Sequence, residues 1–399
     1  MKNLVLVLNC GSSSIKFSVL DPNNEVVYLN GEASALNLDS SSIIWNTKNN
    51  KKISVCKKFM SHNYAIEYLC KEILLEKNSL LFSKIIGFGH RVVNGGINFK
   101  KSVLIDNLVI KKLEKCIFLA PIHNPLNLMG IKKFIKLFPK LHNKNVAVFD
   151  TSFHYKIPKM SYLYAIPKEF YYKYSIRKYG AHGISCNYIL QKSSKIFKKN
   201  IKCLNVIICH LGNGSSVSVV KNGVCIDTSM GFTPTDGLIM GTRSGDIDPS
   251  IIFYMNENLG ISIKDIKNIL NNKSGILALN GKSSDFRHSE NKYYSSEIDK
   301  LTITMFCYRL AKYISSYFFL IKNKIDAIIF TGGIGTNSSL ARKITIHYLN
   351  SLNFYIDNKK NQKKCLDFNF INKNDTIPIL VISTNEEIVI AKDTFNLVS

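Results

Sequence analysis

The chain has 399 residues, 46% hydrophobic and 20% charged, which is typical of a globular protein with room for two domains and excludes a disordered chain. Its net charge of +25 suggests a nucleic-acid binder, but only six of the 53 basic residues are arginine and the lysines are spread along the whole chain. A functional basic surface should be local and mixed with arginines or aromatic residues. A biased composition therefore explains the charge better, and we expect no nucleic-acid partner.

Neither membrane insertion nor secretion is expected. The apolar run at residues 4–8 is too short for the core of a signal peptide, and the longest later run, near 317–321, is far below the ~20 residues that span a bilayer. The ten cysteines are scattered, without a C-x-x-C pair or zinc-site spacing. Such cysteines are typical of thiols in a reducing compartment, so we expect a cytoplasmic protein with no membrane partner.

The first segment predicts a strand, a tight turn and a second strand over residues 3–21, with a third strand near 26–28. Its loop, N-C-G-S-S-S, is not a Walker loop, because the lysine signature is missing and a strand follows. Phosphate contacts would come from backbone N–H groups and serine hydroxyls, with Lys16 adding charge. Taken alone, this segment is better explained as a plain hairpin with a polar turn.

In the next segments, polar side chains follow several of the predicted strands. Arg91 follows the strand of K-I-I-G-F-G-H-R, the loop A-P-I-H-N-P presents His123, and Asp150 ends the buried strand at 146–149. Catalytic groups gather at such strand ends in α/β folds. Four histidines lie in glycine or proline loops near strand ends, which favours a shared site: His90, His123, His182 and His210.

Residues 206–226 repeat the pattern of the first segment about 200 residues further along the chain. A strand, the loop H-L-G-N-G-S-S, a second strand, an Asn-Gly turn and a third strand follow one another. The repeat predicts a duplicated domain with a ligand between the halves. Downstream, four glycines surround Arg243, and we expect them to let the backbone lie against a charged ligand, since glycines cost entropy on folding.

The C-terminal half predicts core-facing helices at 251–270 and 297–323, with a polar loop at 283–287 between them that could cover a nucleotide. The run I-I-F-T-G-G-I-G-T-N-S predicts a strand, a glycine-rich turn and a helix beginning near Asn337, whose N-terminus would bind an anion. That signal is weak alone and stronger beside the two hairpin loops.

The last helix is predicted to begin at Thr384, as N-cap, with Glu387 at the capping-box position. This leaves Glu386 available as a hard oxygen ligand of the kind that Mg²⁺ prefers. Taken alone, Glu386 is better explained as a solvated residue at a helix start.

Together these motifs resemble the acetate kinase family, within the superfamily of sugar kinases, actin and related ATPases, over nearly the whole chain. The resemblance implies an α/β fold of two duplicated ribonuclease H-like (actin-like ATPase) domains, each with a βββαβαβα core, and an interdomain cleft. Residues 1–150 with 385–399 would form the N-terminal domain. Residues 151–384 would form the C-terminal domain, with most ATP contacts and the dimer interface.

The resemblance also implies a homodimer, a Mg²⁺ cofactor (or Mn²⁺), and the reversible transfer of a phosphoryl group from ATP to acetate, which gives acetyl phosphate and ADP. The metal would be held by Asn9 and Glu386. The catalytic residues would be Asp150, His182, Arg243 and Arg91. Acetate would be bound by Arg91, Val93, Ile122, His123 and Pro234. ATP would be bound by Lys16, His210, Leu211, Gly212, Asn213, Gly214, Asp285, Phe286, Arg287, Gly333, Ile334, Gly335, Thr336 and Asn337.

Physical chemistry narrows the roles of these residues. Phosphoryl transfer needs mainly positioning and charge neutralisation, and acetate is already ionised, so Asp150 is expected to orient the metal or an arginine rather than take a proton. The two arginines would cancel repulsion between anions, and His182 would donate to the equatorial oxygens. A propionate kinase stays open, because one methylene is discriminated by only ~1–3 kcal/mol. A non-kinase actin-like ATPase is the alternative from another class, although no residues remain for a peptide-binding domain.

Overall fold

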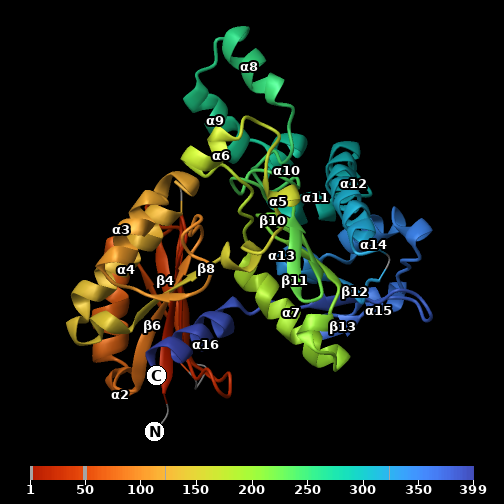
Figure 1. Ribbon diagram of the computed structural model, residues 1–399. Coiled ribbons are helices and arrows are strands. Elements are labelled where there is room, and N and C mark those ends of the chain that lie inside the picture. The colour runs from red at the N-terminus through yellow and green to blue at the C-terminus, as the bar shows by residue number, and fades with distance from the viewer. Residues whose placement is uncertain (1–2, 48–51, 122, 323) are drawn as a thin grey trace. The chain divides into compact units, whose positions relative to one another are not determined.

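The computed structural model describes residues 3–47, 52–121, 123–322 and 324–399 (Figure 1). The chain divides into two compact units, Met1–Tyr155 with Asn385–Ser399, and Lys156–Thr384. No helix in these described ranges is both long and apolar enough to cross a membrane. All ten cysteines lie in them and keep their thiols, as the scattered spacing predicted.

The first unit is built on an eight-stranded sheet in the order β5-β4-β3-β2-β1-β6-β8-β7. Strands β1 to β5 pair antiparallel in sequence, whereas β1, β6 and β8 run parallel. The strands are β1 (Leu4–Cys10), β2 (Ile15–Leu20), β3 (Val27–Ser34), β4 (Ser42–Thr47), β5 (Lys52–Cys56), β6 (Ile85–Val92), β7 (Val103–Leu104) and β8 (Asn145–Phe149).

Helices cover this sheet, and the last one, α16, returns to it from the end of the chain (Figure 1). The helices are α1 (His62–Tyr68), α2 (Ser79–Phe82), α3 (Asn107–Lys115), α4 (Asn124–Leu137) and α16 (Glu386–Val398), with a π-helical segment (Leu69–Glu76) and 3₁₀ turns (Ile117–Leu119, Pro139–Lys144, Ser152–His154). A Cβ on Gly89 of β6 would lie 2.4 Å from Thr394 Oγ1, so glycine is what lets α16 pack directly on the sheet. Strand β1 is almost fully buried, because α16 and α4 both pack against it.

The second unit has a six-stranded sheet in the order β11-β10-β9-β12-β14-β13. Its strands are β9 (Val206–Leu211), β10 (Ser215–Lys221), β11 (Val224–Thr228), β12 (Ala327–Thr331), β13 (Phe368–Phe370) and β14 (Ile379–Ile382). Its helices are α5 (Lys159–Tyr162), α6 (Glu169–Tyr174), α7 (Gly183–Phe197), α8 (Pro249–Glu257), α9 (Ile263–Asn272), α10 (Gly275–Asn280), α11 (Phe286–Asn291), α12 (Glu297–Leu320), α13 (Gly332–Asn337), α14 (Ser339–His347) and α15 (Asn358–Gln362), with 3₁₀ turns at Ile201–Cys203 and Asn350–Leu352.

The two sheets confirm the internal repeat and the α/β fold class. In each unit three consecutive strands form an antiparallel meander, and the first strand of the meander then pairs parallel with a later strand. The parallel neighbour is β6 for β1 and β12 for β9. The carboxyl ends of these parallel strands carry the residues discussed below.

Several predicted boundaries were wrong. The helix expected near Asn337 begins earlier, because the glycine-rich run itself forms α13, and a second helix starts at Ser339 with Ser338 as its N-cap. The last helix is capped by Asn385, whose side chain accepts a hydrogen bond from Ile388 N, and not by Thr384. The helix predicted at 251–270 is two helices, α8 and α9, separated by Gly260 with a φ of +65°.

Candidate active site

In the first unit, Arg91 lies between two carboxylates. It is near the end of β6, while Asp150 directly follows the parallel neighbour β8. Arg91 Nη2 donates to Asp150 Oδ2 at 2.7 Å and its Nε donates to Oδ1 at 3.2 Å, while Nη1 lies 3.7 Å from Glu386 Oε2. Burial lowers the pKa of Arg91, but the two carboxylates outweigh it and raise the pKa above its ordinary value. The guanidinium is therefore held charged and in one orientation.

The loop after β6 is fixed by the side-chain amides of α4. Asn127 Oδ1 accepts from Val93 N at 3.1 Å, and Asn127 Nδ2 donates to the carbonyl of Cys10 at 2.9 Å. A single side chain thus joins the predicted acetate-binding loop to the end of β1, where half-buried Asn9 lies. Half-buried His123 is at the start of α4, and Ile122 lies outside the described residues.

Asn9 pairs across the first hairpin with Lys16 of β2, whose side chain is exposed. The turn between them is closed by Gly11 N, which donates to Ser14 O at 2.7 Å. Glu386 is the first residue of α16, and its side chain is 19% exposed. Because α16 packs on β1, the first unit carries both predicted metal ligands at the ends of packed elements.

In the second unit, two histidines stack face to face. His182 and His210 have ring centroids 4.2 Å apart and an interplanar angle of 24°. His182 precedes α7 in the left-handed region, with a φ of +57°, and its Nδ1 is 3.0 Å from Ser216 Oγ. His210 Nδ1 is 2.8 Å from Ser185 Oγ, which in turn lies 2.8 Å from Thr384 Oγ1. Hydroxyl groups therefore orient both rings through their Nδ1 atoms.

Arg243 differs from Arg91 in its surroundings. Its Nη1 donates to the carbonyl of Pro234 at 3.2 Å, and no carboxylate lies within ion-pair distance in the part of the chain that the structure describes. Burial lowers the pKa of Arg243. A Cβ on Gly214 would be 3.4 Å from His182 Nε2 and 3.6 Å from Arg243 Nη1, so the two side chains converge on this glycine.

The second unit also has a cavity of about 690 Å³, which begins at the two residues before Gly214, Gly212 and Asn213. It brings together three of the predicted ATP-binding segments, at 212–213, 285–287 and 333–337. It also includes Ser284, from the polar loop 283–287 that was expected to cover a nucleotide, and two residues that were not among the predicted ATP-binding residues, Glu290 and Ser338. Ser338 Oγ donates to Glu290 Oε1 at 2.6 Å, so these two close one wall together. The lining residues are Gly212, Asn213, Ser284, Asp285, Phe286, Arg287, Glu290, Gly333, Ile334, Asn337 and Ser338.

The walls of this cavity are held by two arginines. Arg287 donates three hydrogen bonds to Asp285, which lower the pKa of that carboxyl. Buried Arg342 donates through Nη1 to the carbonyls of Gly335 (2.8 Å) and Thr336 (3.0 Å), and burial lowers its pKa to about 10. Arg342 thereby fixes the glycine-rich helix α13. No loop or motif in the sequence points to Arg342, because it lies within an amphipathic helix.

Two expectations about the site were wrong. His90 is buried in the core of the first unit, where its Nε2 meets Asn145 Oδ1 at 2.8 Å and burial lowers its pKa to about 4, so it is a neutral structural residue. The glycines around Arg243 were expected to face a ligand, but each packs against protein atoms. A Cβ on Gly241, for example, would lie 1.8 Å from Asn213 Oδ1, and one on Gly237 would lie 2.5 Å from Ser229 O.

The duplicated sheets, with a cationic strand end in the first unit and glycine-rich elements at strand ends in the second, define the class of the acetate and propionate kinases with an actin-like ATPase fold. Within this class, the chain belongs to the acetokinase family, whose family model matches residues 4–392. It is 55% identical to the acetate kinase of Buchnera aphidicola subsp. Baizongia pistaciae over 394 residues, 98% of each chain. It is 45% identical to that of Escherichia coli (strain K12) over 395 residues, 99% of this chain and 98% of the other.

Two solved structures are similar along their whole length. A propionate kinase from Francisella tularensis subsp. tularensis SCHU S4 has a TM-score of 0.93 and 43% identity, with 99% of this chain and 100% of the other covered. The acetate kinase of Porphyromonas gingivalis has a TM-score of 0.91 and 35% identity, with both chains fully covered.

Proposed function

We propose that the chain catalyses the reversible, in-line transfer of the terminal phosphoryl group of ATP to acetate, which gives acetyl phosphate and ADP. The observation that carries the proposal is Arg243, a half-buried guanidinium with no acidic partner among the described residues, which converges with His182 on Gly214. A cation in such a place is costly unless an anion binds beside it. Membership of the acetokinase family supports acetate and ATP as the substrates.

The residues of the chain would act by neutralising and positioning charge. Acetate is already an anion, so its carboxylate can attack without a general base once repulsion from the phosphates is cancelled. Arg91 and Arg243 would supply that cancellation, and His182 would donate a hydrogen bond to the equatorial oxygens. Asp150 grips Arg91 through both carboxylate oxygens, which supports a role in orienting the arginine rather than in taking a proton.

A magnesium ion fits the donors that the first unit offers. No group of three or more His, Cys, Asp or Glu side chains in the described ranges could hold a metal by itself. Mg²⁺ does not need one, because it is commonly held by one or two protein oxygens together with water and substrate phosphates. Asn9 and Glu386 would supply those oxygens, and Mn²⁺ accepts the same ligands. The bound ion would neutralise phosphate charge.

Propionate is the second candidate substrate, because the Francisella relative with a TM-score of 0.93 is described as a propionate kinase. Val93 and Pro234 would border the methyl group, together with Ile122, which lies outside the described residues. An added methylene changes such binding by only ~1–3 kcal/mol. Comparing kcat/KM for acetate and propionate with the same enzyme preparation would decide the preference.

We also propose a homodimer formed through α12. One stripe of this helix exposes large apolar side chains at three- and four-residue steps, which is the spacing of a helix–helix seam. Their exposed fractions are Ile298 52%, Leu301 57%, Met305 37% and Tyr308 53%. A two-fold axis would place the stripe against its own copy and bury it. Light scattering of Leu301→Glu beside the unchanged protein tests this, since a monomer is expected only for the variant.

The activity is tested by trapping acetyl phosphate as hydroxamate in the presence of ATP, Mg²⁺ and acetate. Arg243→Ala should lower the rate by a factor of at least about 100, since loss of one group that stabilises the transition state costs ~3 kcal/mol. The fold should persist, as judged by circular dichroism. Near-normal turnover of the variant would remove Arg243 from the mechanism. Slow ATP hydrolysis that ignores acetate would instead indicate an actin-like ATPase.

A further inference from the structure

Asp246 closes the loop that carries Arg243. The loop begins at Gly237 and ends at Asp246, and two hydrogen bonds join these ends. Gly237 N donates to Asp246 Oδ1 at 2.8 Å, and Asp246 N donates to Gly237 O at 3.0 Å. The loop between them is tightly constrained, because Met240 is fully buried and Met240 N donates to Arg243 O at 3.2 Å.

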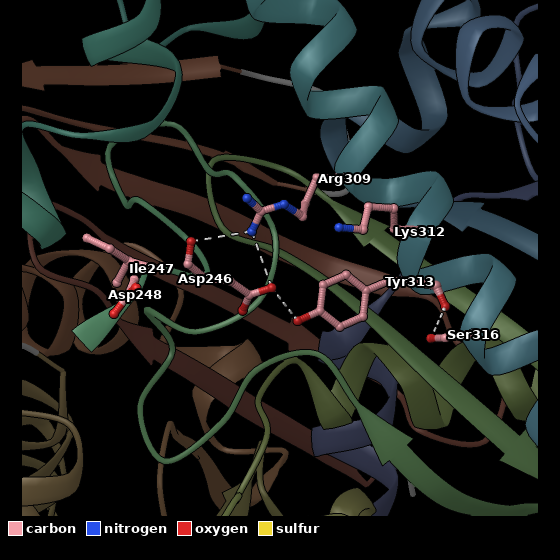
Figure 2. A pocket seen from close by; sticks show the side chains of 7 residues that line it. All are labelled: Asp246, Ile247, Asp248, Arg309, Lys312, Tyr313 and Ser316. Atoms are coloured by element: carbon pink, nitrogen blue, oxygen red, sulfur yellow. Dashed lines mark hydrogen bonds and ion pairs between the residues drawn. The ribbon is translucent and has the colours of Figure 1, made fainter. Parts of the chain in front are cut away.

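The second carboxylate oxygen of Asp246 ties the same loop to α12 (Figure 2). Tyr313 donates its hydroxyl to Asp246 Oδ2 at 2.8 Å, and Arg309 Nη1 lies 3.3 Å from that oxygen. Arg309 also donates to the backbone carbonyl of Asp246 at 3.4 Å. These three side chains line a cavity of about 470 Å³, together with Ile247, Asp248, Lys312 and Ser316. Oδ1 of Asp246 thus binds within the loop, whereas Oδ2 binds side chains of α12.

The backbone of the loop cannot hold this shape by its own preferences. Gly237 has a φ of +100° and Gly245 a φ of +71°, values that are rare for other residues but cost entropy for glycine as well. A Cβ on Gly245 would lie 2.5 Å from Leu238 O, so the two ends of the loop are close-packed. External hydrogen bonds are therefore needed to keep Arg243 in one place, and Asp246 supplies those at the base.

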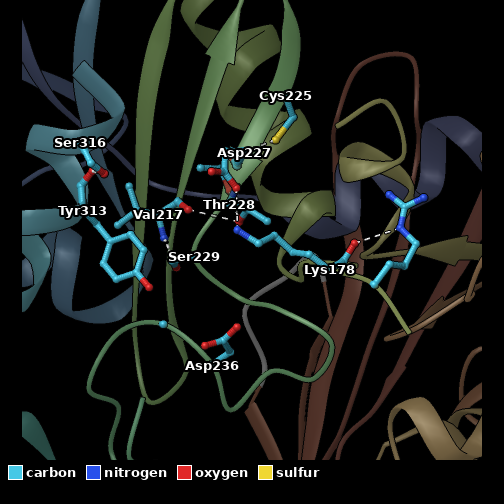
Figure 3. A network of polar contacts seen from close by, with 12 residues as sticks. Lys178, Val217, Cys225, Asp227, Thr228, Ser229, Asp236, Tyr313 and Ser316 are labelled. Carbon is cyan, nitrogen blue, oxygen red and sulfur yellow. Dashed lines mark hydrogen bonds and ion pairs between the residues drawn. The ribbon is translucent and has the colours of Figure 1, made fainter. Parts of the chain in front are cut away.

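A second acidic side chain lies at the same base (Figure 3). Asp236 accepts a hydrogen bond from Tyr164 at 3.3 Å, and the nearby pair of Lys178 and Asp227 is joined at 2.7 Å. Burial and the neighbouring carboxyl of Asp246 raise the pKa of Asp236 to about 6. The Gly237 amide nevertheless donates to Asp246 and not to Asp236. The clamp on the loop is thus specific to one of the two carboxylates.

We propose that Asp246 is a positioning residue for Arg243: its carboxylate clamps the loop 237–246 and fixes it to Tyr313 and Arg309, so that the guanidinium meets the anionic substrate in a set place. The inference rests on the proposed function for the identity of that anion. It concerns the acetate step, because Arg243 does not line the nucleotide cavity.

The test compares three variants with a matched control. Asp246→Ala removes both contacts, Asp246→Asn keeps an acceptor for Gly237 N but not for Tyr313, and Tyr313→Phe removes the hydroxyl alone. The control is Asp248→Asn, which makes the same charge change two residues away at the N-cap of α8. We expect kcat/KM for acetate to fall by about 10- to 100-fold in Asp246→Ala, because a 1 Å misplacement can cost that much. The decrease should be smaller in Asp246→Asn and Tyr313→Phe and absent in the control.

Two further readouts separate positioning from general stability. The KM for ATP should change less than kcat/KM for acetate. The loop reaches the nucleotide wall where Gly241 N donates to Asn213 O at 2.9 Å, whereas α13 is held by Arg342. Hydrogen exchange should accelerate in peptides that span 237–246 and remain unchanged around α13. Equal losses for acetate and ATP, or unchanged exchange in the loop, would overturn the proposal.

The outcomes also separate this proposal from the proposed function. If the unchanged protein makes no acetyl phosphate, the proposed function fails, and the exchange measurement still decides whether Asp246 clamps the loop. If Arg243→Ala is inactive but Asp246→Ala has the original kinetics, only the positioning role is overturned. If Asp246→Ala does not fold, kcat/KM for acetate is compared instead between Asp246→Asn and Tyr313→Phe on one side and the control Asp248→Asn on the other.

Discussion

Gly275 offers a way to move Arg243 without touching its side chain. A Cβ built on Gly275 would lie 2.1 Å from Met240 O and 2.6 Å from Arg243 O. Since real Cβ contacts are essentially never under 3.0 Å, Gly275→Ala must displace the backbone of the Arg243 loop by about 1 Å. A shift of that size at a reacting group lowers the rate by ~100-fold. We therefore expect Gly275→Ala to lower kcat/KM for acetate by about that factor.

Gly281, at the other end of the same helix α10, provides the control. Its φ is +68°, against +64° for Gly275, so alanine suffers the same backbone strain at both positions, about 1–2 kcal/mol. A Cβ on Gly281, however, meets nothing within 4 Å. Denaturant unfolding should show the strain alone for Gly281→Ala and a larger loss for Gly275→Ala, which adds the clash, while only Gly275→Ala loses activity in the hydroxamate assay. Equal activities of the two folded variants would refute the link between this contact and Arg243.

Two other predictions follow from the second unit. The pKa of Asp236 is raised from 3.8 to about 6, so its stabilising contribution is complete below pH 3.8 and is lost as the pH rises through 6. In Asp236→Asn, the free energy of unfolding should therefore fall less steeply between pH 3.8 and 6. An unaltered slope would mean that other groups cause the decline. Ser185→Ala should lower kcat/KM by about tenfold, because His210 and Thr384 lose a buried hydroxyl partner worth ~1–3 kcal/mol. The ¹⁵N shifts of His210 should report an altered tautomer balance, and unchanged shifts would contradict that reasoning.

The sequence was sufficient for the fold because its local signals agree with the tertiary structure. The two β meanders could be recognised from short apolar runs joined by polar turns, and Arg91 and Asp150 from their positions at the ends of such runs. The sequence pattern does not show which of two neighbouring polar residues caps a helix. Asn385, and not Thr384, caps the last helix. The hydroxyl of Thr384 instead shares a hydrogen bond with Ser185, which is distant in the sequence.

Residues that act through tertiary contacts were the ones the sequence could not reveal. Arg342, in α14, donates to the carbonyls at the end of α13. Asp246 joins the two ends of the loop 237–246 and also binds Tyr313 of α12. Neither role depends on neighbours in the sequence. A motif can indicate that a segment binds a ligand, but the partners that fix its shape come from elsewhere in the fold.

The glycines near Arg243 illustrate this limit and change the physical picture of the site. Their number indicated a backbone that approaches a charged ligand, yet the space beside Gly237 and Gly245 is filled by carbonyl groups of the protein itself. Gly333, in contrast, borders the nucleotide cavity and has no protein atom within 4 Å of a Cβ position. Glycine thus has two tasks here. At Gly333 it leaves room for a ligand, whereas around Arg243 it lets the loop fold tightly. The half-buried guanidinium then bonds to the backbone carbonyl of Pro234, and Asp246 bonds to the base of the loop, without a counter-ion on Arg243 that would compete with the substrate.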